Sequence, residues 1–118
     1  MAQAARLICA SAELADGGKG IRFEIPAESG PQSAFVVRHG GQVYGYLNRC
    51  AHIGVELDWQ PGEFFEDSGL YLVCTTHSAT YLPDSGMCIA GPCRGARLTQ
   101  PDAFEQDGGV YLKQRPVQ

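Results

Sequence analysis

The sequence has no long hydrophobic run. Near its N-terminus the chain has only a brief apolar stretch, Leu7 to Ala10, before Ser11, Ala12 and Glu13, and this stretch is too short for the hydrophobic region of a secretory signal peptide. Nowhere does the chain approach the roughly 18 consecutive apolar residues of a membrane span. We therefore expect a cytoplasmic protein with no membrane partner.

Positive charge is scarce. Nine Lys and Arg residues stand against thirteen Asp and Glu, for a formal net charge of −4. Phosphate contact needs clustered Lys and Arg, so the charge argues against a nucleic-acid partner. One group of carboxylates crowds between residues 52 and 74: Glu56, Asp58, Glu63, Glu66 and Asp67. They suit docking to a basic patch on a partner protein, or they simply keep an exposed loop solvated.

The sequence also lacks a nicotinamide fingerprint, a flavin motif and a mononuclear iron site. With 118 residues the chain leaves no room for a separate catalytic domain beside a cofactor site. There is no internal repeat and no low-complexity tract, and residues 1–118 are expected to form a single domain. Fifteen Gly and seven Pro residues favour many turns and short strands over long helices.

Short runs rich in β-branched and aromatic residues predict an all-β protein. Gly40-Gly41 and Gly108-Gly109 are predicted turns, each between two such runs. The predicted strands are Arg6 to Ala10, Ile21 to Ile25, Ala34 to His39, Gln42 to Asn48, Leu70 to Val73, Ala79 to Leu82, Met87 to Ala90, Phe104-Glu105 and Val110 to Lys113.

Two short pairs of metal-ligating residues are the most specific feature of the chain, Cys50-Ala51-His52 and Cys74-Thr75-Thr76-His77. Each pair places one thiolate and one imidazole in a tight loop. Two Cys on one iron and two His on the other make the mixed ligand set of a 2Fe-2S cluster. A structural zinc site is the alternative that the same four ligands permit, although a C-x-H spacing is uncommon in zinc loops.

These pairs and their surroundings resemble the Rieske family, whose pattern is C-x-H, a spacer, and C-x2-H. Gly54 and Leu57 follow the first pair as in many Rieske domains, and residues 80–86 resemble the aromatic and turn segment after the second. Gly91, Pro92 and Leu98 resemble the proline loop, which lies beside the cluster and limits water access. The resemblance is strong over about residues 46–98.

The resemblance implies a fold and a ligand set. The fold is an antiparallel β-sheet, sandwich-like base domain with an inserted cluster-binding subdomain at about residues 46–98. One 2Fe-2S cluster per chain is held by Cys50, His52, Cys74 and His77, and the residues around it are Tyr81, Ser78, Gly54, Gly91 and Pro92. The free nitrogens of the two imidazoles face the surface in this family.

The resemblance further implies a one-electron carrier, a ferredoxin-like component that passes electrons between a reductase and an oxygenase or other oxidoreductase. We expect an electron-transfer protein or oxidoreductase component rather than a stand-alone enzyme. Three alternatives stay open: a small Rieske-like subunit of a reductase such as nitrite reductase, an iron-sulfur sensor of protein contacts, and a zinc-stabilised interaction module. The oligomeric state, the donor and the acceptor are not given by the sequence.

Several residues depart from the family's better-known members. Rieske proteins of quinol-oxidising complexes join their two ligand loops by a disulfide, but Glu56 and Thr76 stand where its cysteines would be. Loop closure is therefore expected to come from the cluster. Thr75 and Ser78 replace the usual Pro and Gly, which places the chain in an atypical branch.

Ala79 replaces the Ser that donates a hydrogen bond to high-potential clusters, whereas Tyr81 keeps a hydroxyl that can do so. We expect a potential near the low end of the range of about −150 to +300 mV. Outside the ligand pairs, Cys88 and Cys93 are expected to be small buried thiols, with a disulfide or a redox-responsive thiol pair as the alternative. Trp59, Phe64 and Phe65 are expected in the core, with an exposed docking surface as the alternative.

Overall fold

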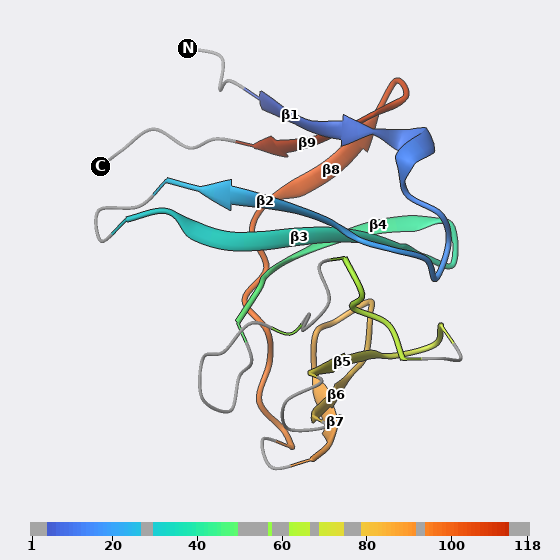
Figure 1. Ribbon diagram of the computed structural model, residues 1–118, viewed down its shortest axis with the longest axis vertical. Coiled ribbons are helices and arrows are strands. Elements are labelled where there is room, and N and C mark those ends of the chain that lie inside the picture. Colours follow the sequence, from blue (N-terminus) through green and yellow to red (C-terminus); the bar gives the residue numbers. More distant parts are fainter. Residues whose placement is uncertain are drawn as a thin grey trace.

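The computed structural model of the chain describes residues 5–26, 30–49, 57, 62–66, 69–74, 79–91 and 94–113. Within these residues the protein forms nine strands and one short 3-10 helix, η1 (Ser11–Glu13). The strands make three antiparallel sheets of three strands each (Figure 1). The prediction of an all-β protein is confirmed. No helix in the described part of the chain is long and apolar enough to cross a membrane.

Two of the sheets form the base of the molecule. The first has the order β1-β9-β8, with β1 at Ala5–Ala10, β8 at Ala103–Gln106 and β9 at Gly109–Lys113. The second has the order β2-β3-β4, with β2 at Ile21–Ile25, β3 at Gln32–His39 and β4 at Gln42–Leu47. Strand β4 also lies against β8, which brings the two sheets together at one edge.

The third sheet lies between β4 and β8 in the sequence and below the base in Figure 1. Its order is β5-β6-β7, with β5 at Leu72–Cys74, β6 at Ala79–Tyr81 and β7 at Cys88–Ala90. Four-residue strands were predicted at these places. Strand β5 begins two residues later and ends one residue later than predicted, and β6 and β7 are each one residue shorter. Leu70 and Tyr71 are exposed, and the carbonyl of Tyr71 accepts a hydrogen bond from the Glu66 N–H in a turn that precedes the strand.

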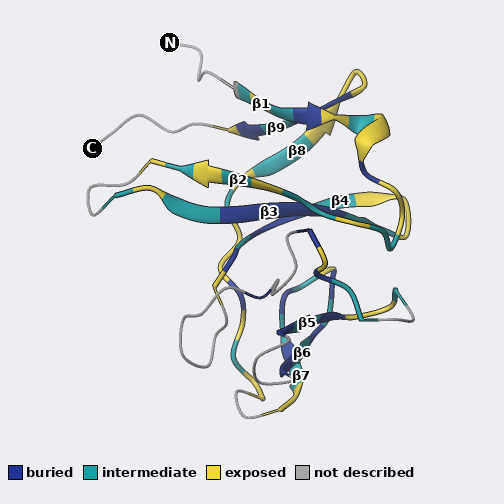
Figure 2. Ribbon diagram, viewed as in Figure 1, coloured by how far each residue is buried: buried dark blue, intermediate teal, exposed yellow. Residues whose placement is uncertain are grey.

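The middle of strand β3 is buried (Figure 2), and it separates two hydrophobic clusters. Alternate side chains of a strand point to opposite faces of the sheet. Val36 therefore packs with Cys9, Leu14 and Val110 between the base sheets. Its neighbours Phe35 and Val37 pack with Tyr46 and with the third sheet on the other side. A run of four buried residues from Ala34 to Val37 is the result.

Two hairpins of the base have turns of only two residues. Gly40 and Gly41 have φ angles of 60° and 82°, and His39 pairs with Gln42 across them. This turn was predicted. The other turn is Asp107-Gly108, with φ angles of 50° and 80°, and Gly109 already pairs with Gln106. The predicted Gly108-Gly109 turn is thus wrong by one residue. Asp tolerates positive φ better than most side chains, so the turn does not need two glycines.

Candidate metal centre

The second ligand pair begins at the end of β5. Cys74 is the last residue of that strand, is fully buried, and pairs with Ala79, the first residue of β6. The four positions that connect them include His77 and Ser78, both of which lie outside the described residues. Strand pairing therefore holds the two ends of this ligand segment together, and Cys74 is the one predicted ligand that the structure describes.

The side chains around Cys74 are apolar. Leu72 and Cys74 alternate with half-buried Val73, and opposite them Ala79 and Tyr81 alternate with half-buried Thr80. The buried members of this face form one cluster with Leu57, Phe64, Cys88 and Leu98. A thiolate is costly in such surroundings unless a cation binds it. A buried iron ligand at Cys74 fits this requirement, because bonding to iron neutralises the charge.

Tyr81 lies on the same face of the sheet as Cys74. It pairs with Leu72, two residues before Cys74, and its side chain is fully buried. Residues in this diagonal relation on neighbouring antiparallel strands have side chains within reach of each other when one is aromatic. The role of Tyr81 beside the cluster and the bond from its hydroxyl to the cluster both remain predictions.

The first ligand pair is framed by Asn48 and Leu57. Cys50, His52 and Gly54 lie outside the described residues. On either side of them, the backbone N–H of Leu57 donates a hydrogen bond of 2.8 Å to the Asn48 Oδ1. Leu57 is fully buried and belongs to the same hydrophobic cluster as Cys74. The structure thus brings the end of the first ligand segment against the sheet that carries the second.

The segment that resembles a proline loop follows β7. Gly91 is exposed with a φ angle of 101°, whereas Pro92 and Cys93 lie outside the described residues. Beyond them the N–H groups of Gly95 and Leu98 donate to the carbonyls of Cys88 and Gly86, and Leu98 is buried against the cluster that contains Cys74. The chain therefore returns to the hydrophobic cluster of Cys74 at Leu98, while the place of Gly91 and Pro92 beside an iron-sulfur cluster remains a prediction.

The remaining sequence-predicted residues have mixed outcomes. Phe64 is a core residue, as expected, and Phe65 is half-buried against the same core. Cys88 is a buried cysteine, also as expected, and its Sγ lies 3.2 Å from the Ala90 carbonyl oxygen. Trp59, Glu56, Asp58 and Asp67 lie outside the described residues. Of the acidic group, Glu63 is exposed and Glu66 half-buried.

Two contacts near the site were not predicted. The first is the bond between Asn48 and Leu57, and the second joins the base to the third sheet through Tyr46. Its buried hydroxyl donates to the Pro83 carbonyl in the turn between β6 and β7. Burial raises the pKa of Tyr46 above its usual value, so the phenol stays neutral. An Asn two residues before a predicted ligand was the only sequence signal for the first contact, and nothing in the sequence marked the second.

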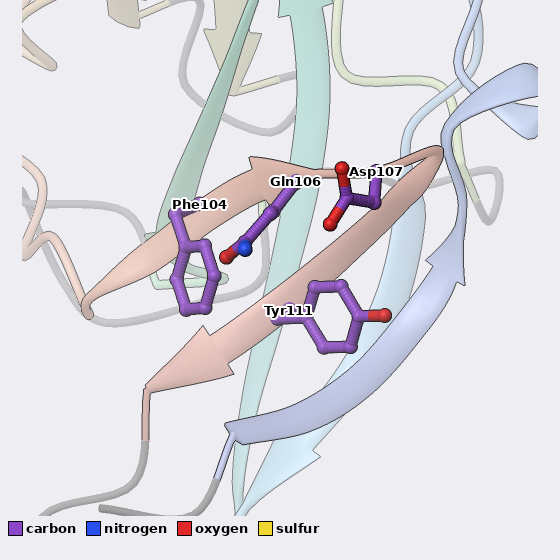
Figure 3. A pocket seen from close by; sticks show the side chains of 4 residues that line it. All are labelled: Phe104, Gln106, Asp107 and Tyr111. Atoms are coloured by element: carbon purple, nitrogen blue, oxygen red, sulfur yellow. The ribbon is translucent and has the colours of Figure 1, made fainter.

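A separate hollow of about 180 Å³ lies on the β8-β9 hairpin. It is lined by Phe104, Gln106, Asp107 and Tyr111 (Figure 3). The rings of Phe104 and Tyr111 stack with centroids 5.6 Å apart. The described residues that line the hollow all belong to the β8-β9 hairpin of a base sheet, and Cys74 is not among them.

Comparison with solved structures shows several similar folds. The ferredoxin of carbazole 1,9a-dioxygenase from Nocardioides aromaticivorans IC177 is 20% identical with a TM-score of 0.69, and the match covers 94% of this chain and 98% of that one. The Sphingomonas yanoikuyae B1 ferredoxin is 23% identical with a TM-score of 0.68, over 97% of this chain and 100% of that one.

Larger proteins share the fold in part. A structure of the reduced complex between oxygenase and ferredoxin in carbazole 1,9a-dioxygenase is 19% identical, with a TM-score of 0.75 over 94% of this chain. This chain spans only 28% of the chain matched there. No match was found among curated protein sequences.

A family model decides the classification. The model of the Rieske [2Fe-2S] domain matches residues 5–111, which include both ligand pairs and residues from all nine strands. This family uses an iron-sulfur cluster, so the match favours a 2Fe-2S centre over a zinc site. The chain belongs to the Rieske [2Fe-2S] domain family.

Proposed function

We propose that this chain is a one-electron carrier that holds one Rieske 2Fe-2S cluster and delivers electrons to an oxygenase. The observation that carries the proposal is Cys74, a buried thiol at the end of β5 within the matched Rieske domain. Two of the proteins with a similar fold are ferredoxins, and the matches cover 98% and 100% of their chains. Another similar structure is a complex between an oxygenase and its ferredoxin.

In this proposal Cys50 and Cys74 bind one iron, and His52 and His77 bind the other. When bound, the cluster takes up and releases one electron. The chain contributes an apolar surrounding, because Leu57, Leu72 and Leu98 are buried beside Cys74 and exclude water from its thiolate. Tyr81, Ser78, Gly54, Gly91 and Pro92 surround the cluster without ligating it.

The proposed partners are a reductase as donor and an oxygenase as acceptor, in the cytoplasm, without nucleic acid or membrane. Docking occurs on the face that carries His52 and His77, since these imidazoles are the proposed exit for the electron. The acidic side chains between the ligand pairs, of which Glu63 is exposed, favour a basic patch on the partner.

Ligation is tested with matched variants of the purified protein. The wild type should contain equimolar iron and acid-labile sulfide, absorb visible light, and take up one electron per chain on titration with dithionite. Cys74→Ser and His77→Ala should lose the pigment. Cys9→Ser and His39→Asn should keep it, because Cys9 is buried between the base sheets and His39 stacks on Phe65. A colourless wild type, or pigment retained in His77→Ala, would refute the ligand assignment.

Delivery of the electron is tested separately. The dithionite-reduced protein is mixed with the oxidised oxygenase component of carbazole 1,9a-dioxygenase, and the absorbance of both is followed by stopped flow. Reoxidation of the carrier with matching reduction of the oxygenase is expected, and it should slow as ionic strength rises. A reduced protein that no oxygenase of this class reoxidises would contradict the proposed partner while leaving the cluster assignment intact.

A further inference from the structure

Asn48 is unusual in its burial. Among the described residues it is the only polar or charged residue that is buried as a whole, with 3% of its surface exposed. Burying an amide costs free energy unless its polar atoms are hydrogen-bonded. The Oδ1 of Asn48 accepts the 2.8 Å bond from the N–H of Leu57, nine residues farther along the chain. This bond closes a loop whose interior is residues 49–56.

Both ends of this bond are fixed to the rest of the fold. The backbone N–H of Asn48 donates a hydrogen bond of 2.8 Å to the Ser33 carbonyl, and the Nδ2 of Asn48 lies 3.4 Å from the Ser33 Oγ. Asn48 is therefore bound to strand β3. Leu57 is fully buried in the cluster that contains Cys74. The carboxamide therefore joins the base sheet to the core of the third sheet at the entry and exit of the segment.

The two ligand segments are closed by different means. The ends of the second, Cys74 and Ala79, are backbone partners in the β5-β6 pair. The first segment begins at Asn48, directly after strand β4, and ends at Leu57, which lies outside the strands. The side chain of Asn48 connects these two ends. No disulfide can link the two segments, because neither carries a second cysteine. The ends of both segments are thus held by the protein as well as by the cluster.

We infer that Asn48 is a positioning residue for Cys50 and His52. It acts through the backbone of the segment that carries them, and the inference rests on the proposed function, in which both residues ligate the cluster. By joining the segment's ends before the cluster binds, the carboxamide lowers the entropy that the ligands lose on binding. Without it, the first pair should hold the cluster less tightly and with less uniform geometry.

Holoprotein variants test this. Release of the cluster into excess EDTA is followed by the decay of visible absorbance, and the reduced protein is examined by EPR at a temperature where every variant is folded. Asn48→Ala should release the cluster about tenfold faster than the wild type, with broadened EPR lines. Val36→Ala is the control, because it weakens the core between the base sheets and should change neither measurement.

Two further variants separate positioning from general stability. Asn48→Asp keeps an oxygen that can accept the Leu57 N–H and should restore slow release. Asn48→Ser keeps a polar group, but its side chain is too short to reach the N–H of Leu57, so this variant should release the cluster as fast as Asn48→Ala. It replaces Asn48→Ala in the test if the alanine variant does not fold. Wild-type release and EPR lines in Asn48→Ser, or equal acceleration in Val36→Ala, would overturn the inference. A colourless wild type would instead overturn the proposed function.

Discussion

Phe35 in β3 and Phe64 before β5 stack face to face, with ring centroids 3.8 Å apart and an interplanar angle of 11°. Both rings are fully buried. Phe35 belongs to the base, whereas the carbonyl of Phe64 accepts a hydrogen bond from the N–H of Val73 in the strand that ends at Cys74. This pair is therefore a direct packing contact between the base and the sheet that carries the candidate centre.

Truncating this contact should weaken the attachment of the third sheet. We expect Phe64→Ala to lower the free energy of unfolding by about 3–5 kcal/mol, because it removes a buried ring and leaves a cavity. Urea unfolding followed by circular dichroism measures the loss. Phe104→Ala, which truncates a half-buried ring on the outer hairpin, should cost clearly less. Equal losses in the two variants would show that Phe64 does not have this packing role.

The turn between β6 and β7 should tolerate no side chain at Gly86. Its φ angle is 74°, and an added Cβ would lie 2.7 Å from Cε1 of Tyr46. Gly95 is a matched control, since its φ is 94° but no atom of the described residues lies within 4 Å of an added Cβ. Both alanine variants incur backbone strain of about 1–2 kcal/mol, and Gly86→Ala should cost about 1–3 kcal/mol more through overpacking.

The same urea titrations measure this difference between the two glycine variants. If Gly86→Ala and Gly95→Ala unfold at the same urea concentration, the turn has room to move away from Tyr46. The packing of that ring against the turn, and the bond from its hydroxyl to Pro83, would then be looser than the structure indicates.

The strands were predictable because their signals are local. Ile21 to Ile25 alternates between half-buried and exposed residues, and it was predicted with the observed bounds. Gly40-Gly41 marked a turn by composition alone. The Asp107-Gly108 turn was missed by one residue, since a Gly-Gly dipeptide appeared the better candidate for positive φ and the register of β9 depends on pairing with β8.

The candidate site was predictable in chemistry but not in construction. The spacing of Cys50, His52, Cys74 and His77 identified the ligand types without any knowledge of the fold. The closure between Asn48 and Leu57 could not be read from the sequence, because it depends on how the chain returns after residues 49–56. Contacts between side chains and distant backbone groups are set by tertiary packing and leave no periodic pattern.

Acid should weaken a salt bridge that joins β3 to β8. The Nη2 of Arg38 lies 2.7 Å from the Oε2 of Glu105, and hydrogen bonding from Arg38 lowers the pKa of Glu105 from 4.5 to about 2. A carboxylate whose pKa is lower in the folded state stabilises the fold above its unfolded pKa. That stabilisation is lost as the pH falls from about 4.5 through about 2.

Glu105→Gln tests this pH dependence. The melting temperature of the wild type should exceed that of the variant at pH 7, and the difference should shrink as the pH falls from 5 toward 2. Comparison at each pH cancels the acid loss of the cluster, which affects both proteins. A difference that stays constant over this range would mean that Glu105 is not held in its charged form by Arg38.

The hydroxyl of Tyr81 should raise the reduction potential of the cluster. Tyr81 is diagonal to Cys74 on the buried face of the β5-β6 pair, and a donor near a ligating sulfur stabilises the added negative charge on reduction. A hydrogen bond strengthened by roughly 1 kcal/mol on reduction corresponds to a shift on the order of 40 mV for one electron. Tyr81→Phe should therefore lower the midpoint by about that amount in a spectroelectrochemical titration.

Tyr71→Phe is the control, because it removes an exposed hydroxyl before β5 and should leave the midpoint unchanged. If Tyr81→Phe titrates like the wild type, its hydroxyl bonds elsewhere, and the low potential that we expect is set by the absence of a hydroxyl at Ala79 and by the apolar residues around Cys74.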